Sequence, residues 1–129
     1  SAIANRGWLV QPWVVKMIGD RPTAHTHITP LGWSQESLKV VRSSLEAVVN
    51  DPQGTGIQAH SEQIRIAGKT GTAQTHVPDR PHGWFIGFCP ADEPLVAMAI
   101  VTEHGGSGGD LPALIGKAIC EYVVRQPTS

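Results

Sequence analysis

The chain has 129 residues, of which 40% are hydrophobic and 16% are charged, and its formal net charge is −1. This length fits one domain or a piece of one, and the composition is typical of a globular protein rather than a disordered one. Acids and bases are spread evenly, so no basic run supplies the electrostatic footprint of a nucleic-acid-binding protein. No apolar run approaches the roughly 18 residues of a membrane span. We therefore expect no nucleic acid partner and no membrane span in this stretch.

The N-terminal part predicts two elements. "SAIANRGW" resembles the last turn of a helix that ends at Asn5-Arg6-Gly7, with no opening signal before it, which suggests a fragment of a longer domain. "WVVKMI" (Trp13 to Ile18) has the composition of a β-strand, bounded by Pro12 and by Gly19-Asp20.

A helix is expected from Ser34, a good N-cap, to about Val49, and "NDPQGTG" ends it. Its predicted buried stripe follows helical spacing and consists of Leu38, Val41, Leu45 and Val48.

Three strands are predicted next, at Ile64 to Ala73, Trp84 to Cys89 and Leu95 to Val101. The turn-like "PADEP" makes the last two an antiparallel hairpin. The glycine-rich loop Gly105 to Gly109 then leads to Asp110, the expected N-cap of a closing helix. One face of that helix should be buried and is formed by Leu111, Leu114, Ile115, Ala118, Ile119 and Tyr122. Strands that are adjacent in sequence and flanked by helices predict an α+β fold, with helices packed on an antiparallel sheet.

The two cysteines lie in different predicted elements. Cys89 ends a strand-like run and Cys120 falls in the closing helix. Free cysteine is among the most buried residue types, so two buried thiols are favoured over a disulfide.

"GKTGT", residues 68 to 72, is the stretch that points to chemistry. A phosphate loop is disfavoured, because the first glycine of that motif falls at Gln63 and no helix follows Thr70. A metal site built on the His25-x-His27 pair is also disfavoured, since no further ligand lies at a telling spacing.

One wall of an acyl-transfer site fits the stretch better. Such a site must bind a carboxylate-bearing substrate, admit its backbone closely and donate hydrogen bonds to an oxyanion. Lys69 supplies a fixed positive charge, Gly71 leaves the strand edge open, and Thr72 offers a hydroxyl and a backbone N–H. An ordinary glycine-containing strand end is the structural alternative.

"AGKTGTAQ", "HGWFIGFCPADEP" and "VAMAIVTEHGGSGG", in this order, resemble the C-terminal part of the transpeptidase domain of class B penicillin-binding proteins. The resemblance covers the whole chain, residues 1–129, and implies a fragment of the serine β-lactamase and penicillin-binding-protein transpeptidase fold. Trp84, Phe85, Ile86 and Phe88 are expected in its core rather than in a ligand cage.

The resemblance implies a site with three elements, S-x-x-K, S-x-N and K-T-G, of which only K-T-G is present. It assigns Lys69, Thr70, Gly71 and Thr72 to the catalytic strand, Lys69 and Thr72 to the substrate carboxylate, and Gln74 to the substrate-pairing edge. The nucleophile serine is absent, since none of the residues three positions before Lys16, Lys39, Lys69 and Lys117 is serine. By this reading the chain is inactive alone and needs no cofactor and no metal.

For the parent protein, the resemblance implies a D,D-transpeptidase that cross-links peptidoglycan stem peptides and is trapped by β-lactams. It also implies an upstream anchor, a location outside the bacterial cytoplasmic membrane and work with other cell-wall synthesis proteins. The strand Leu95 to Thr102 would lack a neighbour in such a fragment, which predicts self-association through its exposed edge. The alternative is a non-catalytic module that binds peptides or proteins on the same scaffold.

Overall fold

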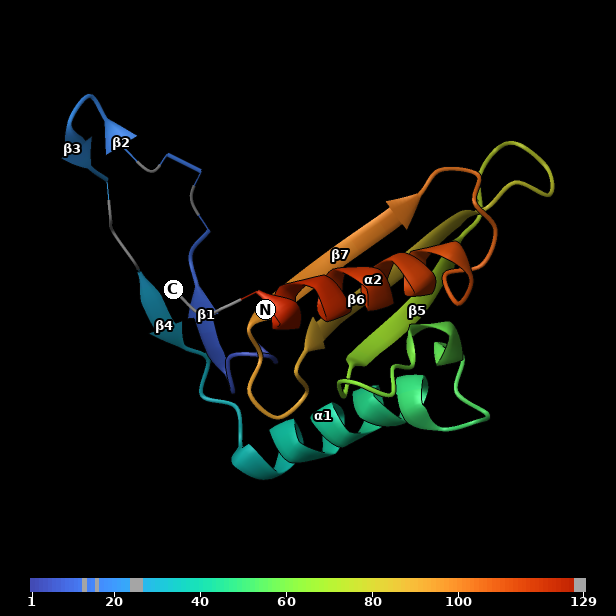
Figure 1. Ribbon diagram of the computed structural model, residues 1–129, viewed down its shortest axis with the longest axis horizontal. Helices are drawn as coiled ribbons and strands as arrows, with labels where there is room; N and C mark the ends of the chain where they lie inside the picture. Colours follow the sequence, from blue (N-terminus) through green and yellow to red (C-terminus); the bar gives the residue numbers. More distant parts are fainter. Residues whose placement is uncertain (13, 16, 24–26, 127–129) are drawn as a thin grey trace.

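A three-stranded antiparallel sheet forms the centre of the molecule (Figure 1). The structure is a computed structural model that describes residues 1–12, 14–15, 17–23 and 27–126. Its strands are β5 (Ala67–Ala73), β6 (His82–Cys89) and β7 (Val96–Thr102), in the order β5-β6-β7. The predicted hairpin and the α+β class are confirmed. The first strand begins at Ala67, three residues later than expected at Ile64.

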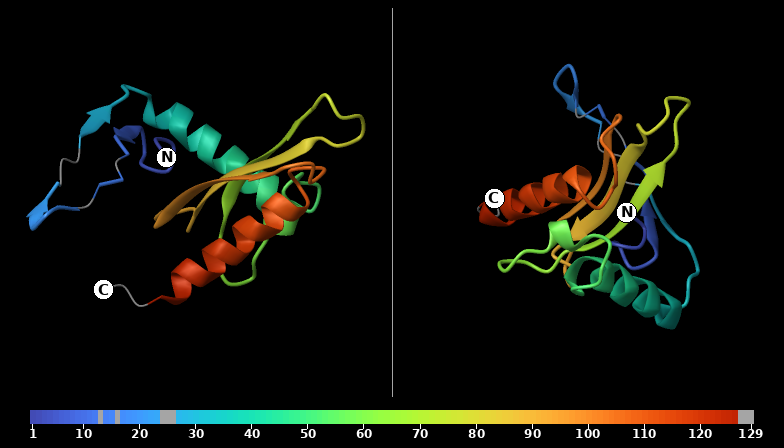
Figure 2. Two further views of the ribbon diagram at one scale, coloured as in Figure 1. Left: turned by 90° about the horizontal axis from the view of Figure 1, so that it is seen from above. Right: turned by 90° about the vertical axis from the view of Figure 1, so that its right-hand side faces the viewer.

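Helix α2 (Leu111–Arg125) covers one face of this sheet, as Figures 1 and 2 show. The face predicted to be buried is wrong, because Leu111, Leu114 and Tyr122 are at least half exposed. The buried residues are instead Pro112, Ala113, Gly116 and Cys120. A Cβ on Gly116 would lie 2.7 Å from the Phe85 ring, so the helix packs against the sheet through its small residues. Asp110 precedes the helix as expected, but its side chain forms no capping hydrogen bond.

Helix α1 (Gln35–Asn50) lies against β5. The predicted cap is confirmed, since the Ser34 hydroxyl accepts a hydrogen bond from the Ser37 N–H at 3.0 Å. Leu38 and Val49 are buried, whereas Val41, expected in the buried stripe, is exposed. At the end of the helix, the Asn50 amide donates to the Ile66 carbonyl at 2.9 Å and ties α1 to the chain that enters β5.

The main core lies between the sheet, α2, the end of α1 and the short 3-10 helix η1 (Ile57–Ala59). Phe85 is fully buried at its centre, as predicted. The buried members of this cluster are Val49, Ala59, Ile64, Ile66, Phe85, Cys89, Ala113 and Cys120.

A disulfide joins Cys89, at the end of β6, to Cys120 of α2. The prediction of two free thiols is therefore wrong. The Cα atoms lie 6.0 Å apart and both side chains are fully buried. The two cysteines are 31 residues apart, so no local sequence pattern indicates that they meet. They meet because α2 packs against the sheet with the face that carries Cys120.

Arg42 of α1 holds the N-terminal turn against the sheet. Its guanidinium donates to the carbonyls of Ile3 (2.9 Å), Ala4 (3.0 Å) and Ala91 (2.6 Å). It also lies over the Phe88 ring, 5.0 Å from its centroid. The turn itself ends at Arg6 and Gly7, both with positive φ, where the sequence predicted the end of a helical turn.

The described residues between Trp8 and Pro30 form a separate ribbon of short strands. β1 (Trp8–Val10) pairs with β4 (Ile28–Pro30), and β2 (Met17–Ile18) pairs with β3 (Arg21–Pro22). The strand predicted from Trp13 to Ile18 is wrong at residues 14 and 15, which lie in no strand, while Trp13 and Lys16 fall outside the described residues. Strands of two or three residues show no alternation that a sequence pattern reveals.

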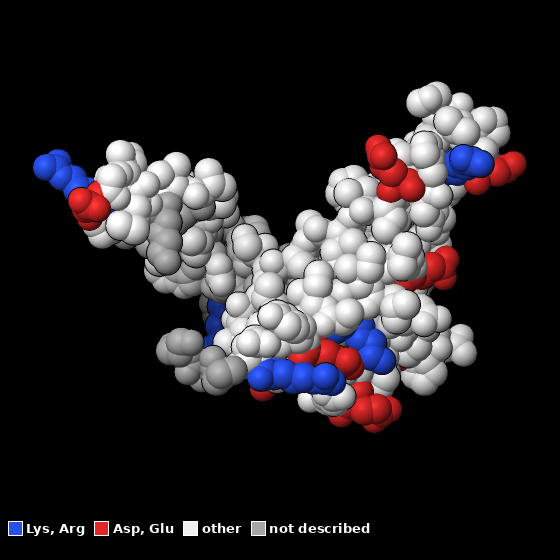
Figure 3. All heavy atoms as spheres, turned by 45° about the horizontal axis from the view of Figure 1, so that its top comes forward, with Lys and Arg blue, Asp and Glu red and all other residues white. Residues whose placement is uncertain are grey.

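The ribbon and the sheet with its loops form two arms (Figures 1 and 3). Figure 3 shows acidic and basic side chains toward the ends of both arms and along the lower surface, whereas the described residues in the hollow between the arms show none in this view. Within the described part of the chain, the helices fall short of the length and apolarity that a bilayer crossing requires.

Candidate functional site

The K-T-G-T residues lie on β5, at an edge of the sheet, and β5 pairs only with β6 among the described strands. Side chains alternate between the two faces of a strand. Thr70 and Thr72 therefore lie on the face covered by α2, together with their neighbour Gly68, which packs on Phe85. Lys69 and Gly71 lie on the opposite face. The two threonines and the lysine thus flank the same unpaired strand edge from opposite sides.

Lys69 is exposed and its ammonium folds back onto the strand, where Nζ donates to the Thr70 carbonyl oxygen at 2.7 Å. No acidic side chain within the described ranges forms an ion pair with it. This arrangement leaves a positive charge beside the strand edge that an anionic ligand can use.

The Thr70 side chain is held by a residue that the sequence did not single out. Its hydroxyl lies 2.8 Å from the hydroxyl of Thr55, in the loop between α1 and η1. Threonine in a glycine-rich loop is unremarkable in a sequence, and only the fold brings the two hydroxyls together across 15 positions.

The glycine-rich loop between β7 and α2 packs directly on the K-T-G strand. A Cβ on Gly108 would clash with the backbone of Gly71 and with the Trp84 carbonyl, and one on Gly109 would clash with the Thr55 carbonyl. Both glycines are buried. The loop therefore lies at the rim of the strand, in the place where the sequence expected a strand-to-helix connection, and it supports the strand from the α2 side.

Two histidines anchor the other end of this loop. The His104 N–H donates to His82 Nδ1 at 3.0 Å, and His104 Nδ1 lies 2.9 Å from the Arg80 carbonyl oxygen. A carbonyl only accepts, so His104 carries its proton on Nδ1 and His82 leaves Nδ1 unprotonated. Their ring centroids are 5.0 Å apart. Their contact links the loop to the connection between β5 and β6.

Gln74 lies one residue beyond the end of β5, which stops at Ala73, and its side chain is exposed. The structure therefore does not place Gln74 in the strand. Thr72 is also exposed, near the end of the strand and opposite Gly83 of β6.

The two glycines of β5, Gly68 and Gly71, have different surroundings. A Cβ on Gly71 would meet only the Trp84 Cβ, at 3.4 Å, whereas a Cβ on Gly68 would lie 2.9 Å from the Ile86 carbonyl and still closer to the Phe85 ring. Gly68 is thus required for packing of the sheet, while Gly71 leaves space on the Lys69 face.

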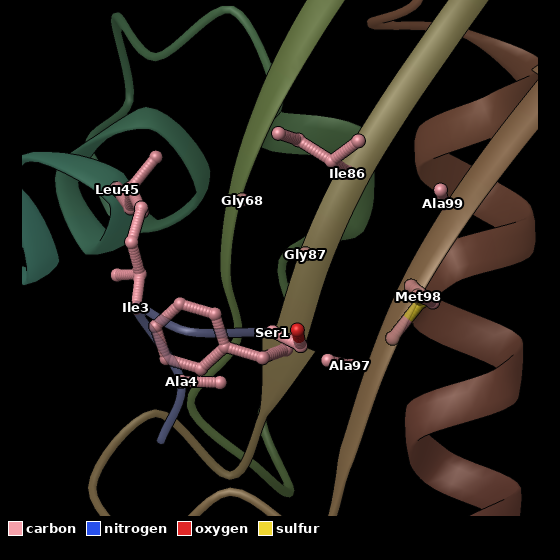
Figure 4. A pocket seen from close by; sticks show the side chains of 11 residues that line it. Ser1, Ile3, Ala4, Leu45, Gly68, Ile86, Gly87, Ala97, Met98 and Ala99 are labelled. Atoms are coloured by element: carbon pink, nitrogen blue, oxygen red, sulfur yellow. The ribbon is translucent and has the colours of Figure 1, made fainter. Parts of the chain in front are cut away.

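The face of the sheet opposite α2 is open and apolar. Trp84 and Ile86 are 42% and 51% exposed, so the prediction that they belong to the core is wrong, although Phe85 and Phe88 are buried. A cavity of about 330 Å³ opens on this face between Ile3, Leu45 and Ile86 (Figure 4). Of the described residues that line it, Ser1 alone carries a hydroxyl and none has a charged side chain, so the lining is mostly apolar.

No cluster of three or more histidine, cysteine, aspartate or glutamate residues suited to a metal occurs in the described ranges. His25 of the His25-x-His27 pair lies outside them.

Residues 1–121 match the family described as the penicillin binding protein transpeptidase domain. Among curated relatives, the chain is 32% identical to the peptidoglycan D,D-transpeptidase PbpA of Mycolicibacterium smegmatis, over 98% of this chain and 28% of the relative. It is 35% identical to the peptidoglycan D,D-transpeptidase MrdA of Acinetobacter baumannii, over 92% of this chain and 20% of the relative.

The fold is similar to solved structures of such proteins. PBP2 of Pseudomonas aeruginosa, in complex with WCK 5153, superposes with a TM-score of 0.81 at 32% identity, over 97% of this chain and 28% of that one. Penicillin-binding protein A of M. tuberculosis, an imipenem acyl-enzyme complex, gives 0.77 at 29% identity, over 96% of this chain and 28% of that one. The chain therefore spans less than a third of the length of each of these proteins.

Proposed function

We propose that this chain, which belongs to the penicillin-binding protein transpeptidase family as a class B fragment, forms part of an active site. It would be one wall of the active site of a peptidoglycan D,D-transpeptidase. The observation that carries the proposal is the K-T-G-T run on an unpaired sheet edge, with a lysine free of acidic partners in the described residues. We call the longer protein to which the chain would belong the parent protein.

The reaction of the parent protein is acyl transfer. A serine hydroxyl outside this chain attacks the carbonyl of the penultimate D-alanine of a stem peptide, and the terminal D-alanine leaves. The amine of a neighbouring stem then attacks the acyl-enzyme, restores the serine and forms the cross-link. Both steps pass through an oxyanion that needs fixed hydrogen-bond donors.

In this proposal the chain binds the substrate beside that serine. Thr72 donates its hydroxyl to the terminal carboxylate and its N–H to the oxyanion. Lys69 supplies positive charge from the other face of the strand, and Gly71 allows the substrate backbone to approach. Thr70 completes the catalytic strand, and Gln74 extends the edge along which the substrate lies.

The nucleophile and the S-x-N serine would come from parts of the parent protein outside these 129 residues, since neither motif occurs in them. We accordingly propose that residues 1–129 form a partial transpeptidase domain and are inactive alone. The relatives are three to five times longer than the stretch they share with the chain, which supports this reading.

β-Lactams are proposed ligands of the parent protein. The M. tuberculosis relative forms acyl-enzyme complexes with imipenem and penicillin G, which supports the same trapping here. The natural ligand is the stem peptide, and other cell-wall synthesis proteins are the proposed partners.

The parent protein is proposed to work outside the cytoplasmic membrane, anchored by a segment outside this chain. The Cys89–Cys120 disulfide supports this location, because disulfides persist in oxidising compartments and are rare in the cytosol.

The free chain is proposed to self-associate. Its edge strand β7 pairs only with β6 among the described strands, and residues such as Val101 leave apolar surface beside that edge. Light scattering across a range of concentrations should give a mass above that of one chain at the high end. A constant monomer mass would refute this proposal.

The test of the function is intact-mass spectrometry with and without benzylpenicillin, on the parent protein and on the chain. We expect a covalent adduct of one penicillin on the parent protein and none on the chain. No adduct on either would favour a non-catalytic binding module.

A further inference from the structure

We propose that Thr55 is a positioning residue for the carboxylate subsite, acting through the hydroxyl of Thr70. The inference rests on the proposed function and extends it to a residue outside the K-T-G-T run. The two hydroxyl oxygens lie 2.8 Å apart, a normal length for a hydrogen bond between hydroxyls.

The direction of the hydrogen bond within the pair follows if a bound carboxylate accepts from Thr70, as we propose. Each hydroxyl has one proton to donate, and a carboxylate only accepts. When Thr55 donates to Thr70, the Thr70 proton is free to donate to the ligand. The reverse orientation would direct the Thr70 proton away from the ligand, toward Thr55. A carboxylate bound at Thr70 therefore selects the chain of donors Thr55 to Thr70 to ligand, and donors in a chain polarise one another.

The loop that carries Thr55 is held on both sides. Gly54 N–H donates to the Asp51 carbonyl at 2.8 Å, and Gly56 N–H donates to the Val48 carbonyl at 2.9 Å. On the far side, Gly109 packs against the Thr55 carbonyl so closely that a Cβ would clash. The backbone of Thr55 is thus fixed between the end of α1 and the glycine-rich loop, which gives its hydroxyl a defined position.

The hydroxyl pair also lies on the correct face. Thr70 and Thr72 project from the same face of β5, and both Thr55 and Thr72 are exposed to solvent. Three hydroxyls therefore border the strand on one side, with the Lys69 charge on the other. This arrangement suits a ligand carboxylate and offers nothing specific to a neutral ester.

The test uses the parent protein and its Thr55→Val variant, which keeps the shape of the side chain and removes the hydroxyl. Stopped-flow acylation separates the pre-acylation dissociation constant from the acylation rate for benzylpenicillin and for its methyl ester. We expect Thr55→Val to weaken binding of the acid roughly fivefold to tenfold and binding of the ester less than twofold. Thr55→Ser should restore binding of the acid to within twofold of the wild type.

Two comparisons make the result decisive. Both probes are measured on the same preparation, so a loss of folded protein lowers acylation by both and cannot change their ratio. Thr55→Val added to Thr70→Val should cost nothing further, because the pair acts as one unit. Ser43→Ala, which removes an exposed hydroxyl of α1, serves as the control and should match the wild type.

An unchanged acid-to-ester ratio in Thr55→Val would overturn the inference while leaving the proposed function intact. This includes the case in which Thr55→Val weakens binding of both probes equally, since Thr55 would then act on the fold alone. Absence of acylation in the wild-type parent protein would refute the proposed function, and the inference with it.

Discussion

The sheet with its two helices is tied together by contacts between distant segments, whereas the ribbon of short strands between Trp8 and Pro30 is not. Around the sheet, a disulfide, the Arg42 contacts and the Asn50 amide join segments that are distant in sequence. The ribbon has strands of two or three residues and exposes large apolar side chains, among them Ile18 at 69%. None of its strand residues belongs to either core cluster.

This contrast indicates where rigidity is needed. An acyl-transfer site works only if its donors are held in place before the ligand arrives, because reorganisation during the reaction would cost free energy. The K-T-G strand is supported by the Thr55 loop and by the Gly108–Gly109 segment. The ribbon carries none of the candidate site residues, so we expect changes there to leave the site intact.

The largest effect on stability should come from removing the disulfide. Cross-linking two residues 31 positions apart lowers the entropy of the unfolded chain and stabilises the fold by about 3–4 kcal/mol. The Cys89→Ala/Cys120→Ala variant should therefore unfold at a clearly lower urea concentration than the oxidised chain. Treatment of the wild type with a reductant is the control and should produce a similar loss. Equal unfolding midpoints would show that the link adds little.

Two valines test the contrast directly. Val49 is fully buried in the main core and Val14 of the ribbon is 99% exposed. Val49→Ala removes two methyl groups from a packed environment and should cost about 2–3 kcal/mol of unfolding free energy. Val14→Ala should change it by less than about 0.5 kcal/mol. A comparable loss of unfolding free energy in Val14→Ala would mean that the Val14 side chain is buried in solution, and the contrast would fail.

Two glycines of the same strand should respond with opposite signs. A methyl group at Gly68 meets the Phe85 ring and the Ile86 carbonyl, so Gly68→Ala should cost about 1–2 kcal/mol. At Gly71 the methyl group has room. Gly71→Ala should therefore leave the free energy of unfolding unchanged or raise it by at most about 1 kcal/mol. In the parent protein, however, Gly71→Ala should slow acylation by benzylpenicillin. Normal acylation would remove Gly71 from the site.

The sequence predicted the elements around the site well, because each carries a local signal. Ser34 can cap a helix without reference to the rest of the chain, and residues 84 to 89 favour a strand on their own, although β6 begins two residues earlier, at His82. The K-T-G strand comes first of the three strands in the chain and pairs next to the hairpin that follows it, which places it at an edge of the sheet.

The contacts between helices, strands and loops could not be predicted from the sequence patterns. Helical spacing places Leu111, Leu114 and Tyr122 on one apolar face, but close packing selects the face with Gly116 and Cys120, where the backbone can approach Phe85. The disulfide and the Thr55–Thr70 hydrogen bond depend on this tertiary arrangement. Trp84 and Ile86 look like core residues in any strand pattern, and only the sheet's open face reveals their exposure.

The central claim is that the K-T-G-T strand is a wall of a serine acyl-transfer site, and the acylation rate of the parent protein tests it most directly. The second-order rate constant with benzylpenicillin is measured for the wild type, for Lys69→Ala and for Lys39→Ala, a matched exposed lysine on α1. We predict a loss of roughly 100-fold for Lys69→Ala, as for other electrostatic donors in such sites, and less than twofold for Lys39→Ala. Equal rates for wild type and Lys69→Ala would contradict the account.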